Sequence, residues 1–461
     1  MVSVHEGYSH APQANLRRRR TAGCVAATLS LTACATSAAR EQPARLDAIE
    51  VVRALDRLAT SPLWPGFDPV HMPLAIYDGR NTLVFRHPGP LPEFRELDRQ
   101  PGAMFVVGRH PAVTANSNAP IGGRQTATLL DQPISLSPKR RAAIAIHELF
   151  HVFQRTRHPG WSANEVNLFV YPVDDVRNLA LRRIESDLLR QALVAQSKLD
   201  VACWAAAAID VRRERYQLLD SASVNYERKS ELNEGLASYV QSQASGEAIV
   251  FPPEEFAPED VRQRSYVSGA AFAFMLDRLM PGWKDSLEQR DDQSLDEIAA
   301  AVPRGTRRCA LEPGAKVLFD STAEADVRDL AARRVRIRNA FLTATGWQLV
   351  VETGNAPLFP QSFDPLNVTR LTASDVLHSR FIRVGSAAGS IEVLGHMSIT
   401  EGIGSHPMFS GIRRVTVAGL FEEPVIGDSA GSVTVRSPGV SATFTPATVE
   451  RQAKTVTLRL R

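Results

Sequence analysis

The stretch "SPKRRAAIAIHELFHVFQ", residues 137–154, contains two histidines one helical turn apart, His147 and His151. Ser137 suits the N-cap of a helix and Pro138 suits its first position, so the stretch predicts a helix over residues 137–157. Because positions i and i+4 of an α-helix share a face, both imidazoles project to the same side. Such a face either binds a metal ion or is an ordinary amphipathic surface.

The glutamate between the histidines favours a metal site. Glu148 lies about 100° round the helix from His147, where it can reach a metal-bound water without binding the metal itself. In a catalytic zinc site the ion lowers the pKa of that water to about 7, and the glutamate accepts its proton. A chance match to His-Glu-x-x-His in a chain this long is on the order of one in a hundred, so a third ligand is needed.

That ligand is expected on a later helix, in "ELNEGLASY", residues 231–239. Two acids compete there, since Glu231 and Glu234 lie almost one turn apart on similar faces. Either could supply a carboxylate oxygen to a zinc ion held by two imidazoles.

The pair "HELFH" and "NEGLASY" resembles the gluzincin metallopeptidases, and among these the zinc aminopeptidases related to leukotriene hydrolase. In that family the third zinc ligand is a glutamate in an Asn-Glu-Gly-x-Ala setting. The resemblance therefore implies that His147, His151 and Glu234 hold one Zn²⁺ ion, with Glu148 as the general base. It also implies a thermolysin-like catalytic domain, built from a small N-terminal sheet and a helical bundle.

A third segment, "SYVSGAA", residues 265–271, resembles the Tyr-x-x-Gly sequence that opens a helix after the ligand glutamate in those aminopeptidases. The resemblance implies that Tyr266 stabilises the oxyanion, as a phenol can by donating a hydrogen bond to developing negative charge. The alternative is a tyrosine at a helix start, half packed and half in water.

One feature of the aminopeptidases is missing. They carry a Gly-x-Met-Glu-Asn strand whose glutamate binds the substrate's free amine. The nearest match here is residues 102–105, "GAMF", which lacks both the glutamate and the asparagine. Aminopeptidase specificity is therefore not inferred, and exo- and endo-action both stay open.

The N-terminal run "RRRRTAGCVAATLSLTAC", residues 17–34, has a basic region followed by a short apolar one, which is typical of a secretory signal. Its end, Leu31-Thr32-Ala33-Cys34, resembles the lipobox of bacterial lipoproteins. That resemblance implies cleavage before Cys34, lipidation of Cys34, and sorting to the outer membrane because Ala35 follows. The alternative is an ordinary signal peptide cleaved within residues 35–39; the true translation start also stays open.

Two cysteines remain outside this segment, Cys203 and Cys309. An oxidising compartment allows them to form a disulfide, although two independent buried thiols would fit the sequence as well.

The formal charge of +3 comes from the same N-terminal segment. Without residues 1–33, Lys+Arg falls from 53 to 49 and Asp+Glu from 50 to 49, so the remainder is neutral. The chain has no overall basic field, and we expect no nucleic-acid partner.

The organisation along the chain predicts an α+β protein. A signal peptide (1–33) precedes an α/β part of the catalytic domain (35–136), a helical zinc-peptidase region (137–336) and an all-β C-terminal domain (337–461). Short apolar runs between Gly and Pro turns predict strands in the first part, of which "GGRQTATLL", residues 122–130, is expected at the sheet edge. Alternating apolar and polar residues predict a sandwich or barrel at the C-terminus, with structural histidines only (His378, His396, His406).

The sequence therefore predicts a zinc metallopeptidase that hydrolyses peptides or proteins in the bacterial cell envelope. It would be lipid-anchored to the periplasmic side of the outer membrane, or periplasmic, and would meet the membrane only through the anchor. Two alternatives stay open: an envelope binding or assembly lipoprotein with a structural or vestigial zinc site, and a zinc hydrolase of a non-peptide amide or ester. The oligomeric state is not predicted.

Overall fold

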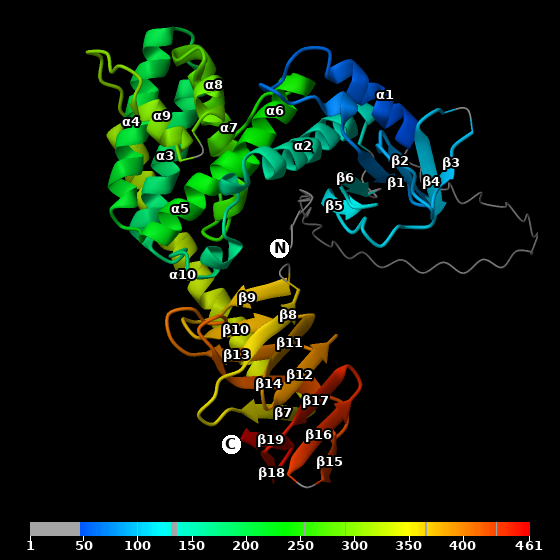
Figure 1. Ribbon diagram of the computed structural model, residues 1–461. Coiled ribbons are helices and arrows are strands. Elements are labelled where there is room, and N and C mark those ends of the chain that lie inside the picture. Colours follow the sequence, from blue (N-terminus) through cyan, green and yellow to red (C-terminus); the bar gives the residue numbers. More distant parts are fainter. Residues whose placement is uncertain are drawn as a thin grey trace, which may run out of the picture. The chain divides into compact units, whose positions relative to one another are not determined.

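The computed structural model describes residues 47–98, 100–130, 136–252, 255–290, 292–364, 367–429 and 431–461. The predicted signal segment and Cys34 lie outside the described residues. By its internal contacts the chain divides into two compact units. Of the described residues, the first unit contains residues 47–61 and 68–152, and the second contains residues 62–67 and those from 153 onward. Figure 1 gives the order of the elements.

The first unit contains helix α1 (Ala48–Leu58) and a six-stranded sheet. Its strands are β1 (Leu74–Tyr77), β2 (Asn81–Phe85), β3 (Arg95–Glu96), β4 (Ala103–Val107), β5 (Ser117–Ile121) and β6 (Arg124–Leu130). The spatial order is β3-β4-β2-β1-β6-β5, with β1 and β6 parallel and the other neighbours antiparallel. Four of these strands, β1, β2, β4 and β6, coincide with short apolar runs in the sequence.

The prediction that residues 122–130 form the edge of the sheet is wrong. Strand β6 lies between β1 and β5, so β5 forms the edge. Pro120 sits in β5, which suits an edge because proline cannot donate a ladder hydrogen bond. Asn116, just before β5, ties this strand to the end of β6, because its Oδ1 accepts a hydrogen bond from the backbone N–H of Leu130 at 2.9 Å. The sequence of β5, SNAPI, does not predict a strand because it lacks a run of apolar residues. A strand at the edge of a sheet is less buried and needs fewer of them.

Helix α2 (Pro138–Arg157) carries the two histidines and forms where the sequence predicts it. The Ser137 hydroxyl accepts a hydrogen bond from the Arg140 backbone N–H at 3.3 Å, as an N-cap does. The division between the two units falls inside this continuous helix, between Val152 and Phe153.

The second unit also contains a region of eight described α-helices, α3 to α10. The helices are α3 (Val176–Val194), α4 (Lys198–Tyr216), α5 (Ser221–Ser230), α6 (Leu236–Ser245), α7 (Val261–Leu279), α8 (Trp283–Glu288), α9 (Leu295–Ala300) and α10 (Pro313–Leu342). Helix α10 runs past the expected boundary at residue 336, and the first C-terminal strand begins at Trp347.

A single π-helical turn, η4 (Glu231–Gly235), joins α5 to α6. Helix α7 crosses it so closely that a Cβ on Gly235 would lie 2.5 Å from the Cα of Gly269. A Cβ on Gly269 would in turn lie 2.7 Å from the backbone oxygen of Glu231. The glycines of the two sequence motifs, Asn-Glu-Gly and Tyr-x-x-Gly, are therefore the contact point of two backbones.

Cys203 and Cys309 form a disulfide, with their Cα atoms 5.5 Å apart. Cys203 lies in α4, and Cys309 lies in the segment between α9 and α10. The bond therefore fastens that segment to the helical region.

The C-terminal region folds into two antiparallel-rich sheets. Their strands are β7 (Trp347–Glu352), β8 (Phe359–Phe363), β9 (Val368–Arg370), β10 (Asp375–His378), β11 (Phe381–Ser386), β12 (Gly389–Leu394), β13 (Ser398–Gly402), β14 (Ile412–Leu420), β15 (Val425–Ser429), β16 (Ser432–Ser437), β17 (Val440–Phe444), β18 (Ala447–Gln452) and β19 (Thr455–Leu460). One sheet has the order β18-β19-β7-β14-β13-β10-β9 and the other β15-β16-β17-β12-β11-β8.

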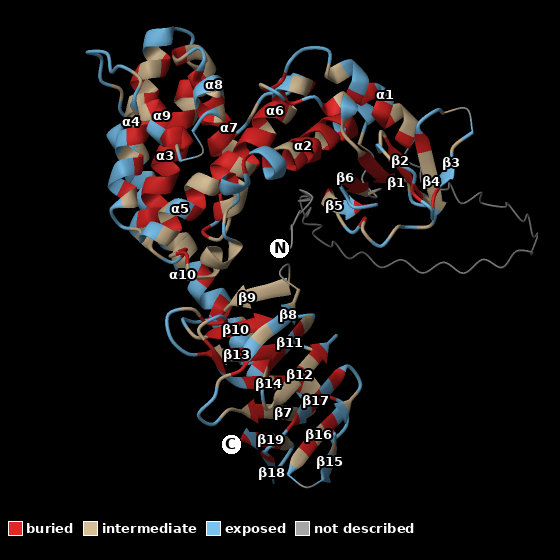
Figure 2. Cartoon of the chain, viewed as in Figure 1, coloured by how far each residue is buried: buried red, intermediate tan, exposed pale blue. Residues whose placement is uncertain are grey.

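Alternate residues of both sheets meet in one apolar core, so the region is a sandwich. Val351 and Val417 come from the first sheet, and Ile391 and Val435 from the second. Figure 2 shows the resulting alternation of buried and exposed residues along the strands. This period of two is what the sequence displayed. Phe341, near the end of α10, packs against Leu371, Leu377, Ile399 and Ala418 and so joins the helices to the sandwich.

The protein is thus of mixed α+β class with an all-β C-terminal region, as predicted from the sequence. Among the described residues, no helix combines the length and the apolar character needed to cross a membrane.

The close crossing of α7 and η4 generates a test. In Gly269→Ala the added methyl group meets the Glu231 backbone, which has no room to move, so we expect a loss of about 1–3 kcal/mol in the free energy of unfolding. Urea denaturation measures this. Gly314→Ala is the matched control: Gly314 lies in α10, where an added Cβ would have no atom within 4 Å, and we expect stability to be unchanged or higher. Equal stability of the two variants would contradict the close contact.

Candidate metal centre

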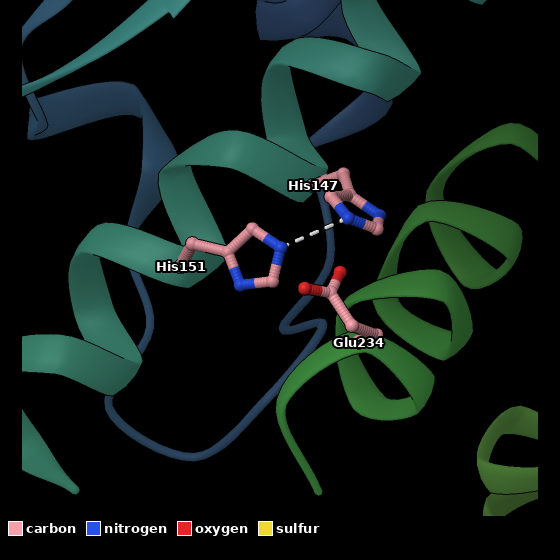
Figure 3. A group of neighbouring side chains, drawn as sticks. All are labelled: His147, His151 and Glu234. Carbon is pink, nitrogen blue, oxygen red and sulfur yellow. Dashed lines mark hydrogen bonds between the residues drawn. The ribbon is translucent and has the colours of Figure 1, made fainter. Parts of the chain in front are cut away.

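Three buried side chains converge in the way the sequence predicts. One ligand atom from each of His147, His151 and Glu234 lies within 4.8 Å of the other two. Figure 3 shows the three side chains pointing toward one another, the histidines from α2 and the glutamate from η4. Among the described residues this is the one such group of three or more histidine, cysteine or acidic side chains. The group could hold a metal ion.

The histidines are fixed by their helix. Their Nε2 atoms are 3.0 Å apart, and the side chains are 5 % (His147) and 7 % (His151) exposed. Glu148, on the same helical turn, is 2 % exposed. A carboxylate this deeply buried is not on the solvated face that an ordinary helix glutamate occupies.

Gln154 links the histidine helix to the ligand glutamate. Its Nε2 donates hydrogen bonds to the backbone oxygens of Leu232 at 2.8 Å and Asn233 at 3.0 Å. A π-helical turn changes the regular pattern of helix hydrogen bonds, and such turns often occur at functional sites. The last part of α2 is therefore bonded to the two residues that immediately precede Glu234.

The choice between the two acids is resolved by their partners. Glu231 accepts hydrogen bonds from Arg212 at 2.6 and 2.7 Å and from the Ser268 hydroxyl at 2.6 Å. Glu234 is the acid that lies with the two histidines. The extra residue in the π turn rotates the two carboxylates to different sides, so they do not share a face as they would in a regular helix.

One oxygen of Glu234 is held by neighbouring donors. Arg262 donates from NH2 to Glu234 Oε1 at 2.7 Å, and the Asn233 side-chain amide donates to the same oxygen at 3.0 Å. Burial lowers the pKa of the Arg262 guanidinium, but Glu234, and then Tyr266 and Glu165, outweigh this effect and raise it. Arg262 therefore stays charged beside the ligand carboxylate.

Tyr266 lies on α7, one turn after Arg262, and is half-buried. Arg262, Tyr266 and Gly269 fall at positions i, i+4 and i+7 and so share one face of the helix. Since Arg262 bonds to Glu234 and Gly269 touches the π turn, this face is the one that α7 presents to η4.

Behind η4 lies a network of buried charges centred on Glu185 of α3. This carboxylate accepts hydrogen bonds from Arg212 and Arg215 of α4 and from Arg264 of α7, at 2.6–3.0 Å. Arg212 also bonds to Glu231, and Arg215 also bonds to Glu227 of α5. The network therefore connects α3, α4, α5, η4 and α7.

The network sets the ionisation of its acids. Burial raises the pKa of Glu185, but Arg212, Arg264 and Arg215 outweigh it and hold the pKa far below its usual range. Burial opposes ionisation of Glu227 in the same way, and Arg215 overcomes it and lowers the pKa to about 2. Both groups are therefore carboxylates at any pH near neutrality.

Sequence reasoning missed three of these elements: Gln154, Arg262 and the Glu185 network. Arg262 carried a signal, since it precedes Tyr266 by one turn of the same helix. Among the sandwich histidines, for which the sequence predicts a structural role, His378 is buried. Burial lowers the pKa of His378 to about 3, and its Nε2 lies 3.0 Å from the Thr400 hydroxyl.

Comparison with protein-family models, with curated proteins and with solved structures finds no match to this chain.

The buried network generates a prediction about acid stability. A carboxylate whose folded pKa is depressed stabilises the fold above its unfolded pKa, about 4.3 for glutamate, and loses that contribution as the pH falls through the folded value. For Glu227 this window runs from about pH 5 down to about pH 2. We expect Glu227→Gln to lower the free energy of unfolding at pH 7 by about 3–5 kcal/mol and to flatten its decline toward low pH.

Urea denaturation at a series of pH values measures both effects. The matched control is Glu324→Gln, because Glu324 forms an exposed pair with Arg328 in α10. We expect it to change stability by less than about 1 kcal/mol. A Glu227→Gln variant as stable as the control at pH 7 would contradict a stabilising role for the network.

Proposed function

We propose that this chain is a zinc-dependent metallopeptidase of the gluzincin type. The observation that carries the proposal is the convergence of buried His147, His151 and Glu234, with Glu148 buried on the same helical turn as the first histidine. A site that used a metal only for structure would gain nothing from Glu148, which is not one of the three converging side chains. No separate cluster among the described residues offers an alternative centre.

The donor set fits zinc. Two imidazole nitrogens and one carboxylate oxygen are the protein ligands of many catalytic zinc sites, in which a fourth position stays open. Two nitrogens bound to one tetrahedral zinc ion are about 3.3 Å apart, close to the 3.0 Å between the Nε2 atoms here. His147, His151 and Glu234 would hold the ion.

Each remaining residue has a defined task in amide hydrolysis. Zinc, when bound, acts as a Lewis acid and makes water a nucleophile near neutral pH. Glu148 accepts the proton of the attacking water on its carboxylate and delivers it to the leaving amine. Tyr266 donates its phenolic hydrogen bond to the oxygen on which negative charge develops. Among the described strands β5 has a neighbour on one side only, and an extended peptide could pair with its other side.

The proposed location is the bacterial cell envelope, with a lipid anchor on Cys34. The disulfide between Cys203 and Cys309 supports export, because such bonds persist in oxidising compartments. The neutral charge of the chain beyond residue 33 argues for a peptide or protein substrate over nucleic acid.

The C-terminal sandwich favours a second candidate, an envelope binding or assembly lipoprotein whose zinc site is structural. It exposes large apolar side chains, Phe421 at 98 % and Val425 at 70 %, of the kind that mark interaction surfaces. Metal analysis followed by digestion of a broad peptide library separates the two candidates. A zinc hydrolase of a non-peptide amide or ester would bind zinc, leave the library intact and cleave small amide or ester substrates.

The proposed mechanism predicts that Glu148→Gln retains zinc but loses hydrolysis by a factor of about 10²–10⁴, since only the general base is removed. Cleavage of the peptide library by the purified protein, with zinc content measured in parallel, tests this. Glu214→Gln is the control because Glu214 is an exposed glutamate on α4, and it should cleave as the wild type does. Full activity in Glu148→Gln would contradict the mechanism.

The ligand assignment predicts that His151→Ala loses the bound zinc, because two ligands cannot hold the ion against dialysis. Elemental analysis of the dialysed protein gives the stoichiometry. His71→Ala is the control, since His71 is exposed and pairs only with Asp68. Equal zinc content in the two variants would count against the site.

A further inference from the structure

We propose that Arg262 is a positioning residue of the metal centre, which fixes the Glu234 carboxylate so that its Oε2 atom is the one that binds the ion. This inference rests on the proposed function only in that it requires a metal at the site. It assigns a role to a residue that belongs to none of the sequence motifs.

The contacts of Glu234 carry the inference. Its Oε1 atom accepts hydrogen bonds from two donors, Arg262 at 2.7 Å and the Asn233 amide at 3.0 Å. A carboxylate oxygen that already accepts two hydrogen bonds has little capacity left for a cation. Metal binding is therefore directed to the second oxygen, in one orientation of the carboxylate.

Arg262 is itself held firmly. Its side chain is 14 % exposed, and its Nε lies 3.6 Å from a carboxylate oxygen of Glu165. The helix that carries it is fixed against η4 by the contact of Gly269 with Gly235. Ligand and positioning residue thus come from two backbone segments in close contact.

The direction in which zinc affinity changes when Arg262 is replaced distinguishes two possible roles of this residue. A guanidinium this close to a ligand repels a divalent cation, so if charge were its only contribution, removing it would strengthen metal binding. If Arg262 orients Glu234, removing it weakens binding, as loss of hydrogen-bonding partners behind metal ligands does, by about 10–100-fold. The two effects have opposite signs.

The experiment measures the zinc affinity of the full chain by competition with a chromogenic chelator, for wild type, Arg262→Gln and Arg262→Lys. We expect Arg262→Gln to bind zinc about 10–100-fold more weakly. Arg262→Lys should fall between, because lysine keeps the charge and one donor but not the planar geometry. Thermal unfolding with excess chelator checks that the metal-free folds are equally stable.

Arg278→Gln is the matched control. Arg278 lies on the same helix, α7, and donates to the backbone oxygens of Ala195 and Gln196. Its variant should bind zinc as tightly as the wild type. If Arg262→Gln does not fold, the comparison of Arg262→Lys with wild type gives the same test, because the lysine variant keeps the charge.

Each outcome is decisive. Unchanged or tighter zinc binding in the Arg262 variants would overturn the inference. Weaker binding, together with no cleavage of any peptide by the wild type, would support the inference while the proposed peptidase function fails. A wild-type protein that binds no zinc would overturn both.

Discussion

The Glu185 carboxylate is the point on which the helical region depends. A fully buried carboxylate without partners would be strongly destabilising, and here Arg212, Arg215 and Arg264 donate to it from two other helices. The three guanidiniums leave each helix little freedom to slide, because any shift would leave one of these charges buried and unpaired. Through Arg212 the constraint extends to Glu231, and so to the π turn that carries Glu234.

The two nearby acids, Glu231 and Glu234, have different partners and different roles. Glu231 belongs to the network that anchors the turn, and Glu234 belongs to the group that could hold a metal. The π turn between α5 and α6 carries both acids. The side-chain amide of Gln154, on the histidine helix, donates hydrogen bonds to the backbone carbonyls of Leu232 and Asn233 in this turn. The group that could hold a metal therefore combines two histidines of one helix with a glutamate of an anchored turn, and such preorganisation would suit the proposed function.

Sequence reasoning succeeded where the pattern is local. Several C-terminal strands, such as β17, alternate buried and exposed residues with a period of two, which is the pattern that predicted an all-β region there. Helix α2 was predicted from its cap and its first proline. The edge strand β5 was missed because an edge strand carries almost no apolar pattern. The helical region was expected to end at residue 336, whereas helix α10 continues to Leu342, and few of its residues are buried. Neither element has a strong periodic pattern, so both depend on the elements around them.

The sequence by itself determined the chemistry of the site: which residue types occur, at which spacing on α2, and in which order the later motifs follow. Helical geometry fixes the relation of His147 to His151, so their proximity needed no further structure. Only the tertiary structure decided between Glu231 and Glu234, because that choice depends on Arg212 and Ser268, which come from α4 and α7. It also revealed Arg262 behind the ligand and explained the two motif glycines. Those roles arise from contacts between segments distant in sequence, which a local pattern does not contain.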